Sequence, residues 1–125
     1  MKLEAKFVFL INALVGLFFG ISFFLMPVMT SDMMAIITDA QGYATAQFMG
    51  LGFLMTAAFL FGIRNAPHSN DRQFLFVALL LYYLGMISLH VLNHVLTNPV
   101  VIIVIAIEAI WAILYLVLFI INMKS

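Results

Sequence analysis

The chain alternates between long apolar runs and short polar breaks. Each run has about the twenty residues that a helix needs to cross a hydrocarbon core roughly 30 Å thick. The runs are apolar on every face, whereas a barrel strand would be about half as long and would alternate between apolar and polar positions. The pattern predicts an all-α, four-helix transmembrane bundle, a single membrane domain over residues 1–125 with spans at about 7–29, 44–63, 74–96 and 100–121.

Composition also indicates that lipid is the solvent for most of the chain. The 125 residues are 66% hydrophobic and 8% charged, and the mean hydropathy is +1.23. A soluble domain of this length has too high a surface-to-volume ratio to bury so much apolar surface. The absence of cysteine excludes disulfides, zinc–thiolate sites and thiol catalysis. The formal net charge of zero gives no indication of a nucleic-acid partner.

The polar breaks carry residues that start and end helices. Pro27 is expected at the end of the first run, where a lost hydrogen bond costs little. Asn70 or Asp71 is expected to cap the third helix. Before the last run, Asn98 is a candidate N-cap and Pro99 suits the first helical position. So short a link predicts that the last two helices form an antiparallel hairpin.

The loop after the first run contains a short apolar segment. Ser31 followed by Asp32 predicts the start of a short interfacial helix, whose apolar face would hold Met33, Ile36 and Ile37. The methionines of this loop allow an alternative, because clustered thioethers bind Cu(I). Methionine is also an ordinary filler of apolar surfaces, which favours the interfacial helix.

The basic residues predict how the chain is oriented in the membrane. All of them fall on one side of the four predicted spans, and the first and third loops contain none. The positive-inside rule makes that side cytoplasmic, so both termini are expected in the cytoplasm. The basic residues are Lys2, Lys6, Arg64, Arg72 and Lys124.

Small residues predict which helices approach closely. Lipid supplies no hydrophobic drive between helices, so close packing depends on small side chains and buried polar contacts. The first run contains Gly16 and Gly20, one helical turn apart. Small residues at helical spacing in the first two helices favour packing of these helices against each other. The alternative is that one of the two rows of small residues is a contact surface in a homo-oligomer. The second helix is expected to carry a ridge of small residues spaced by fours, formed by Gly42, Ala46 and Gly50 and then by Ala58 and Gly62.

Glu108 is the only acidic residue inside a predicted span. A charge at this depth costs several kcal/mol unless it is paired, hydrated or neutralised. Counted from Asn98, Glu108 lies about 15 Å along the last helix, and His90 lies about 12 Å along the preceding helix. These matched depths predict a hydrogen bond or ion pair between His90 and Glu108.

Further polar and aromatic residues on the same two helix faces predict a polar pocket in the outer half of the bundle. His90 and His94, one turn apart, would suit a transition metal together with Glu108, although the Glu that follows the first His in metallopeptidase helices is missing. A proton relay, or a pocket for a quinone or lipid headgroup, needs the same residues without a metal. The simplest alternative is that His90 and Glu108 have a structural role alone, in which they bond each other and hold the two helices of the hairpin together. The ligand-binding or proton-relay candidates are His90, His94, Glu108, Tyr83, Asn93 and Trp111.

The layout resembles a family of small bacterial four-helix membrane proteins of unknown function. The resemblance rests on the run from Gly16 to Gly20 that ends at Pro27, on the close of the second helix at Gly62 to Arg64, and on Glu108 in the last helix. Small quinone-linked proteins of the DoxX type are similar at this level. The resemblance implies the fold and a bacterial or archaeal inner membrane, and it implies no activity or site.

Two functions are compatible with these features. The first is a non-enzymatic integral membrane protein, either an accessory subunit of a larger membrane complex or a small-ligand binder with no catalytic residues. The alternative is a membrane oxidoreductase or transport component that uses His90, His94 and Glu108 for metal or proton handling. The sequence leaves the identity of any cofactor open.

Overall fold

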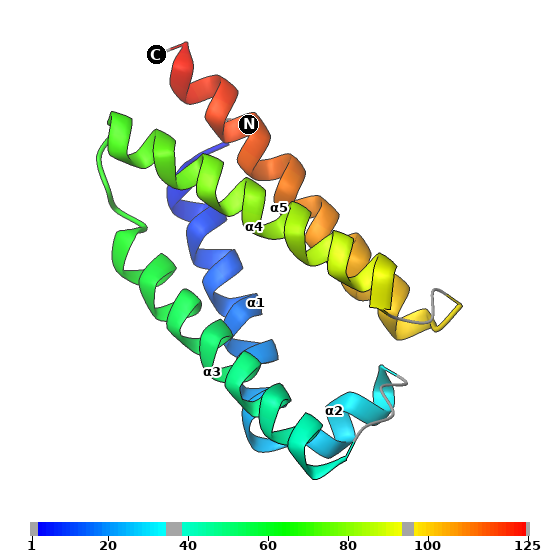
Figure 1. Ribbon diagram of the computed structural model, residues 1–125. Coiled ribbons are helices and arrows are strands. Elements are labelled where there is room, and N and C mark those ends of the chain that lie inside the picture. Colours follow the sequence, from blue (N-terminus) through cyan, green and yellow to red (C-terminus); the bar gives the residue numbers. More distant parts are fainter. Residues whose placement is uncertain (1–2, 35–38, 94–96, 125) are drawn as a thin grey trace. The chain divides into compact units, whose positions relative to one another are not determined.

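The computed structural model describes residues 3–34, 39–93 and 97–124. These residues are 88% helical and contain no strand. Among them are four helices long and apolar enough to span a membrane, which confirms the predicted all-α fold class of a small multi-pass membrane protein. The elements are α1 (Ala5–Leu25), the short α2 (Pro27–Met33), α3 (Ala40–Ile63), α4 (Asn70–Asn93) and α5 (Pro99–Met123) (Figure 1).

The helices fall into two compact units. One unit, Lys6–Arg64, contains α1 to α3, and the other contains α4 and α5 in residues 65–125 together with the first few residues of the chain. The candidate residues Glu108, His90, Tyr83 and Trp111 all belong to the α4–α5 unit. The single four-span domain predicted from the sequence stays a prediction.

In the first unit, α1 and α3 pack closely through glycine. A Cβ added at Gly50 would lie 2.6 Å from the backbone nitrogen of Phe24 and 2.9 Å from the carbonyl oxygen of Gly20. A Cβ added at Gly20 would lie 2.7 Å from Cγ of Leu54. These separations are shorter than any side chain tolerates, so only glycine allows the two backbones to come this close. The predicted packing of the first two spans against each other is confirmed.

In the C-terminal half of α3, the small residue that faces α1 is not one of those predicted for the ridge. Ala57 is buried, whereas Ala58 is exposed and a Cβ at Gly62 would meet nothing within 4 Å. Steps of four residues drift by about 40° each around a helix of 3.6 residues per turn. A ridge that starts at Gly50 therefore continues through Ala57 and leaves Ala58 and Gly62 outside the contact.

The end of the first span differs from the prediction. Helix α1 ends at Leu25, and Pro27 begins α2 instead of closing α1. Proline suits this first position because its missing N–H would have no partner inside the helix. Ser31 is buried within α2, so the predicted helix start at Ser31 and Asp32 is wrong. The predicted apolar positions Ile36 and Ile37 lie outside the described residues.

Thr30 connects α2 to the end of α1. Its hydroxyl lies 2.9 Å from the carbonyl oxygen of Ser22 and 2.8 Å from that of Met26. The methionines of this segment divide between two environments: Met34 is 4% exposed, and the exposed ones are Met26, Met29 and Met33. Met34 therefore does not join the other three on the surface, and the copper alternative gains no support.

Side-chain caps set the starts of α3, α4 and α5. Asp39 accepts a hydrogen bond from Gly42 N at 3.0 Å, and α3 begins earlier than the predicted residue 44. Ser69, and neither Asn70 nor Asp71, caps α4, because its Oγ accepts from the backbone N–H of Arg72 at 3.1 Å. The capping residue lies just before the first helical turn, and the sequence prediction placed it one or two residues too late.

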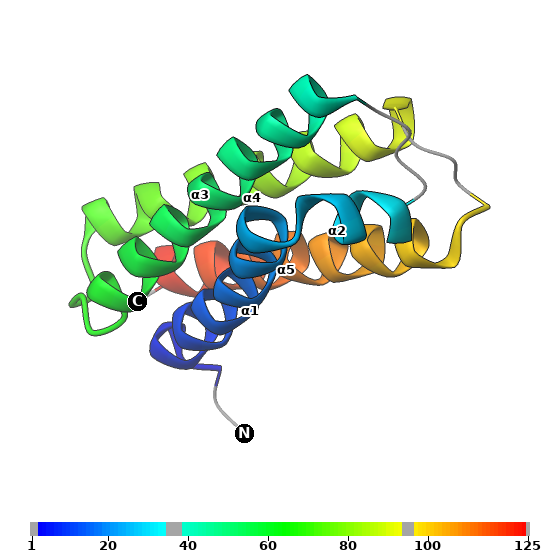
Figure 2. The ribbon, with the colours of Figure 1, turned by 90° about the horizontal axis from the view of Figure 1, so that it is seen from below.

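Asn98 caps α5 as predicted, with Pro99 at the first helical position. Its Oδ1 accepts hydrogen bonds from the backbone nitrogens of Val100 at 2.9 Å and Val101 at 3.3 Å. Helices α4 and α5 pack along each other in opposite directions (Figures 1 and 2), which confirms the predicted hairpin. Helix α4 is described as far as Asn93, and residues 94–96 of the predicted third span lie outside the described residues.

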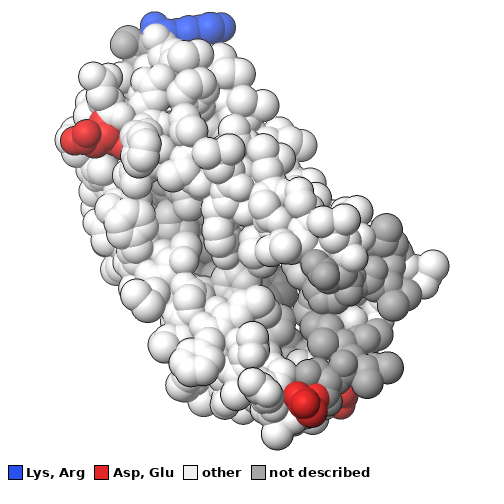
Figure 3. Space-filling view, viewed as in Figure 1, with Lys and Arg blue, Asp and Glu red and all other residues white. Residues whose placement is uncertain are grey.

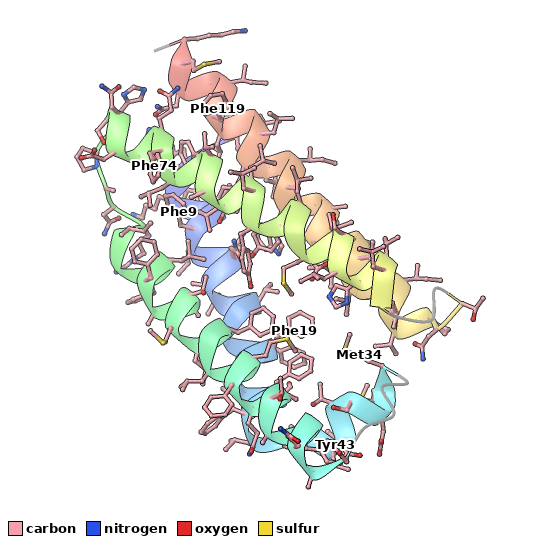
Figure 4. The ribbon with its side chains drawn as sticks, viewed as in Figure 1. Phe9, Phe19, Met34, Tyr43, Phe74 and Phe119 are labelled. Carbon is pink, nitrogen blue, oxygen red and sulfur yellow. The ribbon has the colours of Figure 1, made fainter. Side chains whose placement is uncertain are left out.

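The outer surfaces of the helices are apolar. Phe74 of α4 is 71% exposed (Figure 4), and Leu92 of the same helix is 79% exposed. On the face seen in Figure 3, charged side chains lie near the ends of the helices, and the surface between them carries none. Large exposed apolar side chains are expected where a helix contacts lipid.

Candidate functional site

His90 of α4 and Glu108 of α5 meet inside the hairpin. Nε2 of His90 lies 3.1 Å from Oε1 of Glu108, and the two residues are only 6% and 7% exposed. The contact confirms the pairing that their matched depths predicted. Either the imidazole N–H donates to the carboxylate, or a protonated carboxyl group donates to the imidazole nitrogen.

The second carboxyl oxygen of Glu108 takes no part in the contact with His90. Oε2 is buried and has no hydrogen-bond partner among the described residues. A carboxylate oxygen accepts about two hydrogen bonds, and an unsatisfied buried polar atom costs about 1–3 kcal/mol. The single bond to His90 is therefore one of the roughly four hydrogen bonds that the carboxylate of Glu108 could accept.

An aromatic layer lies next to this pair along the hairpin. Tyr83 and Tyr115 stack with ring centroids 6.0 Å apart and an interplanar angle of 10°. Trp111, one turn from Glu108, lies 6.5 Å from each of these two rings. Tyr83 and Trp111, predicted as site residues, are thus in contact beside the His90–Glu108 pair, and all three rings are at least 90% buried.

Tyr115 belongs to this layer but was not among the predicted site residues. Tyr83 precedes His90 by seven residues, and Tyr115 follows Glu108 by seven. A seven-residue step returns to nearly the same helix face, so two antiparallel helices repeat their contacts at this interval. Matching heptad steps on the two arms of the predicted hairpin place Tyr115 on the Glu108 face of α5, at the depth of Tyr83.

Two of the predicted site residues are not located. His94 lies outside the described residues, and so does the side chain of Asn93. Within the part of the chain that the structure describes, no three His, Cys, Asp or Glu side chains gather as a metal site would require. The metal hypothesis depends on His94 and stays a prediction, as does the polar pocket.

Comparisons with known proteins add no functional assignment. The chain matches no protein-family model, no curated protein and no solved structure. The resemblance in helix layout noted from the sequence therefore gains no support from these comparisons. Any function has to be inferred from the residues themselves.

Proposed function

We propose that this protein binds a small molecule at the His90–Glu108 pair, without catalysing a reaction. One observation carries the proposal: Oε2 of Glu108 is buried, has no hydrogen-bond partner among the described residues and belongs to a residue inside a membrane span. Buried polar atoms in native proteins nearly always have a partner, so an orphaned oxygen requires an explanation. A ligand that donates a hydrogen bond to Oε2 provides one.

The neighbouring side chains define the chemistry of the ligand. Glu108 offers an acceptor, and Trp111 lies one turn from it on α5. Tyr83 lies two turns from His90 on α4, with its ring centroid 6.5 Å from that of Trp111. Small-molecule sites in proteins combine apolar and aromatic walls with a few polar groups that fix orientation. We expect an amphipathic molecule with an N–H or O–H donor and a planar apolar body.

Proton handling is the second candidate function. His90 and Glu108 are both titratable, lie in hydrogen-bond contact and are buried in a helix hairpin. Intramembrane pairs of this kind serve as proton relays in transporters, and Oε2 offers a position for the next proton donor or acceptor. In this case the protein is a transport or oxidoreductase component, and His94 would be the candidate for an additional metal ligand.

The proposed setting is the inner membrane of a bacterium or archaeon, with both termini in the cytoplasm and the protein alone or as an accessory subunit of a larger complex. The distribution of basic residues on one predicted side of the spans supports the orientation of the termini. Co-purification of the tagged protein from native membranes, followed by mass spectrometry of proteins, tests the subunit role.

Mass spectrometry of small molecules extracted from the purified protein tests ligand binding. The site variant is Glu108→Gln, and the matched control is Glu4→Gln, which makes the same change at an exposed carboxylate. Trp111 is the single tryptophan of the chain and lies beside the site, so its fluorescence reports occupancy directly. We expect a small molecule in extracts of the wild type and of Glu4→Gln, and its loss from Glu108→Gln.

Removal of the extracted molecule should shift the emission of Trp111 in the wild type, and adding the extract back should reverse the shift. The same molecules in equal amounts from wild type and Glu108→Gln, with unchanged emission, would contradict a ligand at Glu108. In proton handling, by contrast, Glu108→Gln abolishes proton uptake by proteoliposomes while the extracts stay identical.

A further inference from the structure

A second polar cluster lies at the opposite end of the hairpin. Asn122, near the end of α5, is 4% exposed. Its Oδ1 accepts a hydrogen bond from Nη2 of Arg72 at 3.2 Å, and its Nδ2 donates to Oε1 of Gln73 at 3.2 Å. Asn122 follows Glu108 by fourteen residues, or about 21 Å along the helix, so the two polar clusters occupy different depths.

The positive charge of Arg72 is not balanced within the cluster. Besides Asn122, its guanidinium donates to the carbonyl oxygen of Ala66 at 3.3 Å and lies 5.7 Å from the ring centroid of Phe76. All of these partners are neutral, and Arg72 forms no ion pair within the described ranges. Its Nε is buried and has no acceptor among the described residues. A guanidinium carries five N–H groups, so three of those of Arg72 have no acceptor in the part of the chain that the structure describes.

His68 adds a second group to the same cluster. Its Nε2–H donates to the backbone oxygen of Asn122 at 3.0 Å, which holds the exposed imidazole over the end of α5. Arg72 is partly exposed and lies in the first turn of α4, at the end of a membrane span. We therefore expect both groups at the level where lipid headgroups meet water.

We infer that Arg72 and His68 bind a phosphate group, supplied by the headgroup of an anionic phospholipid. The fork of a guanidinium matches the oxygens of a phosphate, and Arg binds such groups in preference to single-point acceptors. Anionic lipids attract basic residues at the membrane surface, and an anion at the start of α4 is also favoured by the helix dipole. A cluster that served only to join α4 and α5 would leave the charge of Arg72 without a counterion.

Lipid counting by native mass spectrometry tests this site. The purified full-length protein is titrated in neutral detergent with phosphatidylglycerol, with phosphatidylcholine, and with inorganic phosphate alone. The site variant is Arg72→Gln, and the matched control is Arg64→Gln. This control removes a charge from a residue whose guanidinium, among the described residues, bonds the carbonyl of Phe61 and covers its ring. Arg72→Lys keeps the charge and removes the fork.

We expect the wild type to bind phosphatidylglycerol in preference to phosphatidylcholine. Arg72→Gln should weaken phosphatidylglycerol binding about tenfold or more, because a charge-assisted hydrogen-bonded contact is lost. Arg64→Gln should weaken it by at most about fivefold, as expected for loss of a surface charge near anionic lipid. Arg72→Lys should fall between wild type and Arg72→Gln.

Three results would overturn the inference. Equal binding of the two lipids by the wild type would show that no anionic headgroup is recognised, whatever the stability of the variants. Equal losses in Arg72→Gln and Arg64→Gln would indicate general surface attraction. Full competition by inorganic phosphate at low concentration would assign the site to a soluble phosphate compound and remove the lipid.

Discussion

Tyr83 of α4 and Tyr115 of α5 stack nearly parallel, with an interplanar angle of 10°, one heptad away from the His90–Glu108 pair on both helices. Stacked rings in a packed hairpin have few alternative rotamers. This layer therefore fixes the spacing of the two helices beside the pair and limits how far His90 and Glu108 can separate.

The first prediction concerns the coupling between these two polar residues. Glu108→Gln and His90→Gln should each lower the free energy of unfolding by about 1–3 kcal/mol, because each removes a titratable partner and weakens the buried hydrogen bond between the two side chains. The double variant should lose less than the sum of the two single losses, by about 0.5 kcal/mol or more. Chemical denaturation of the detergent-solubilised protein measures all three values, and strictly additive losses would mean that the two residues act independently.

The second prediction compares two glycines of α3. Gly50→Ala should destabilise the protein by about 1–3 kcal/mol, because the new Cβ meets the backbone of α1, which cannot move aside without breaking its own hydrogen bonds. Gly52→Ala, where a Cβ meets nothing within 4 Å, should instead stabilise α3 by about 0.5–1 kcal/mol. Thermal unfolding of both variants should show shifts of opposite sign; shifts of the same sign would place Gly50 outside the interface.

The third prediction tests the cap of α5. Asn98→Ala removes the acceptor for the backbone N–H groups of Val100 and Val101 and should cost about 1 kcal/mol. Asn98→Asp retains an oxygen at the same position and should remain close to wild type. The comparison is made by equilibrium unfolding, and an equal loss in both variants would show that the amide nitrogen, and not the cap, is what matters.

The fourth prediction concerns membrane orientation. Reporter fusions after Lys124 and within residues 64–72 should report the cytoplasm, and a fusion near Asp39 should report the exterior, because all Lys and Arg residues fall on one predicted side. A fusion after Lys124 that reports the exterior would contradict the orientation and the number of spans together.

The parts of the fold that depend on simple chain properties were predictable from the sequence. The number and type of spans follow from the length and uniform hydropathy of the runs. The hairpin and the His90–Glu108 contact follow from a short turn capped by Asn98 and from a constant rise per residue. These predictions needed no knowledge of packing.

Features that depend on packing were missed. The start of α2 at Pro27 was missed because proline suits both the end of one helix and the first turn of another. The ridge on α3 was continued through Ala58 because a spacing of four hides the drift of the helix, whereas Ala57 makes the contact. The unsatisfied Oε2 of Glu108 was not predictable from the sequence. Helix spacing can indicate which residue lies opposite a side chain, but the number of hydrogen bonds that the side chain makes depends on its exact geometry.

The short connection between α4 and α5 also bears on how the protein enters the membrane. On insertion scales an acidic residue at the middle of a single helix costs about 2.5–3.5 kcal/mol, so α5 would carry this penalty if it partitioned alone. Because α4 emerges from the ribosome first and carries His90, the two helices can leave the translocon as a pair with Glu108 already facing its partner. We therefore expect the second half of the chain to insert as one unit, with the polar contact formed before the carboxyl group is exposed to acyl chains.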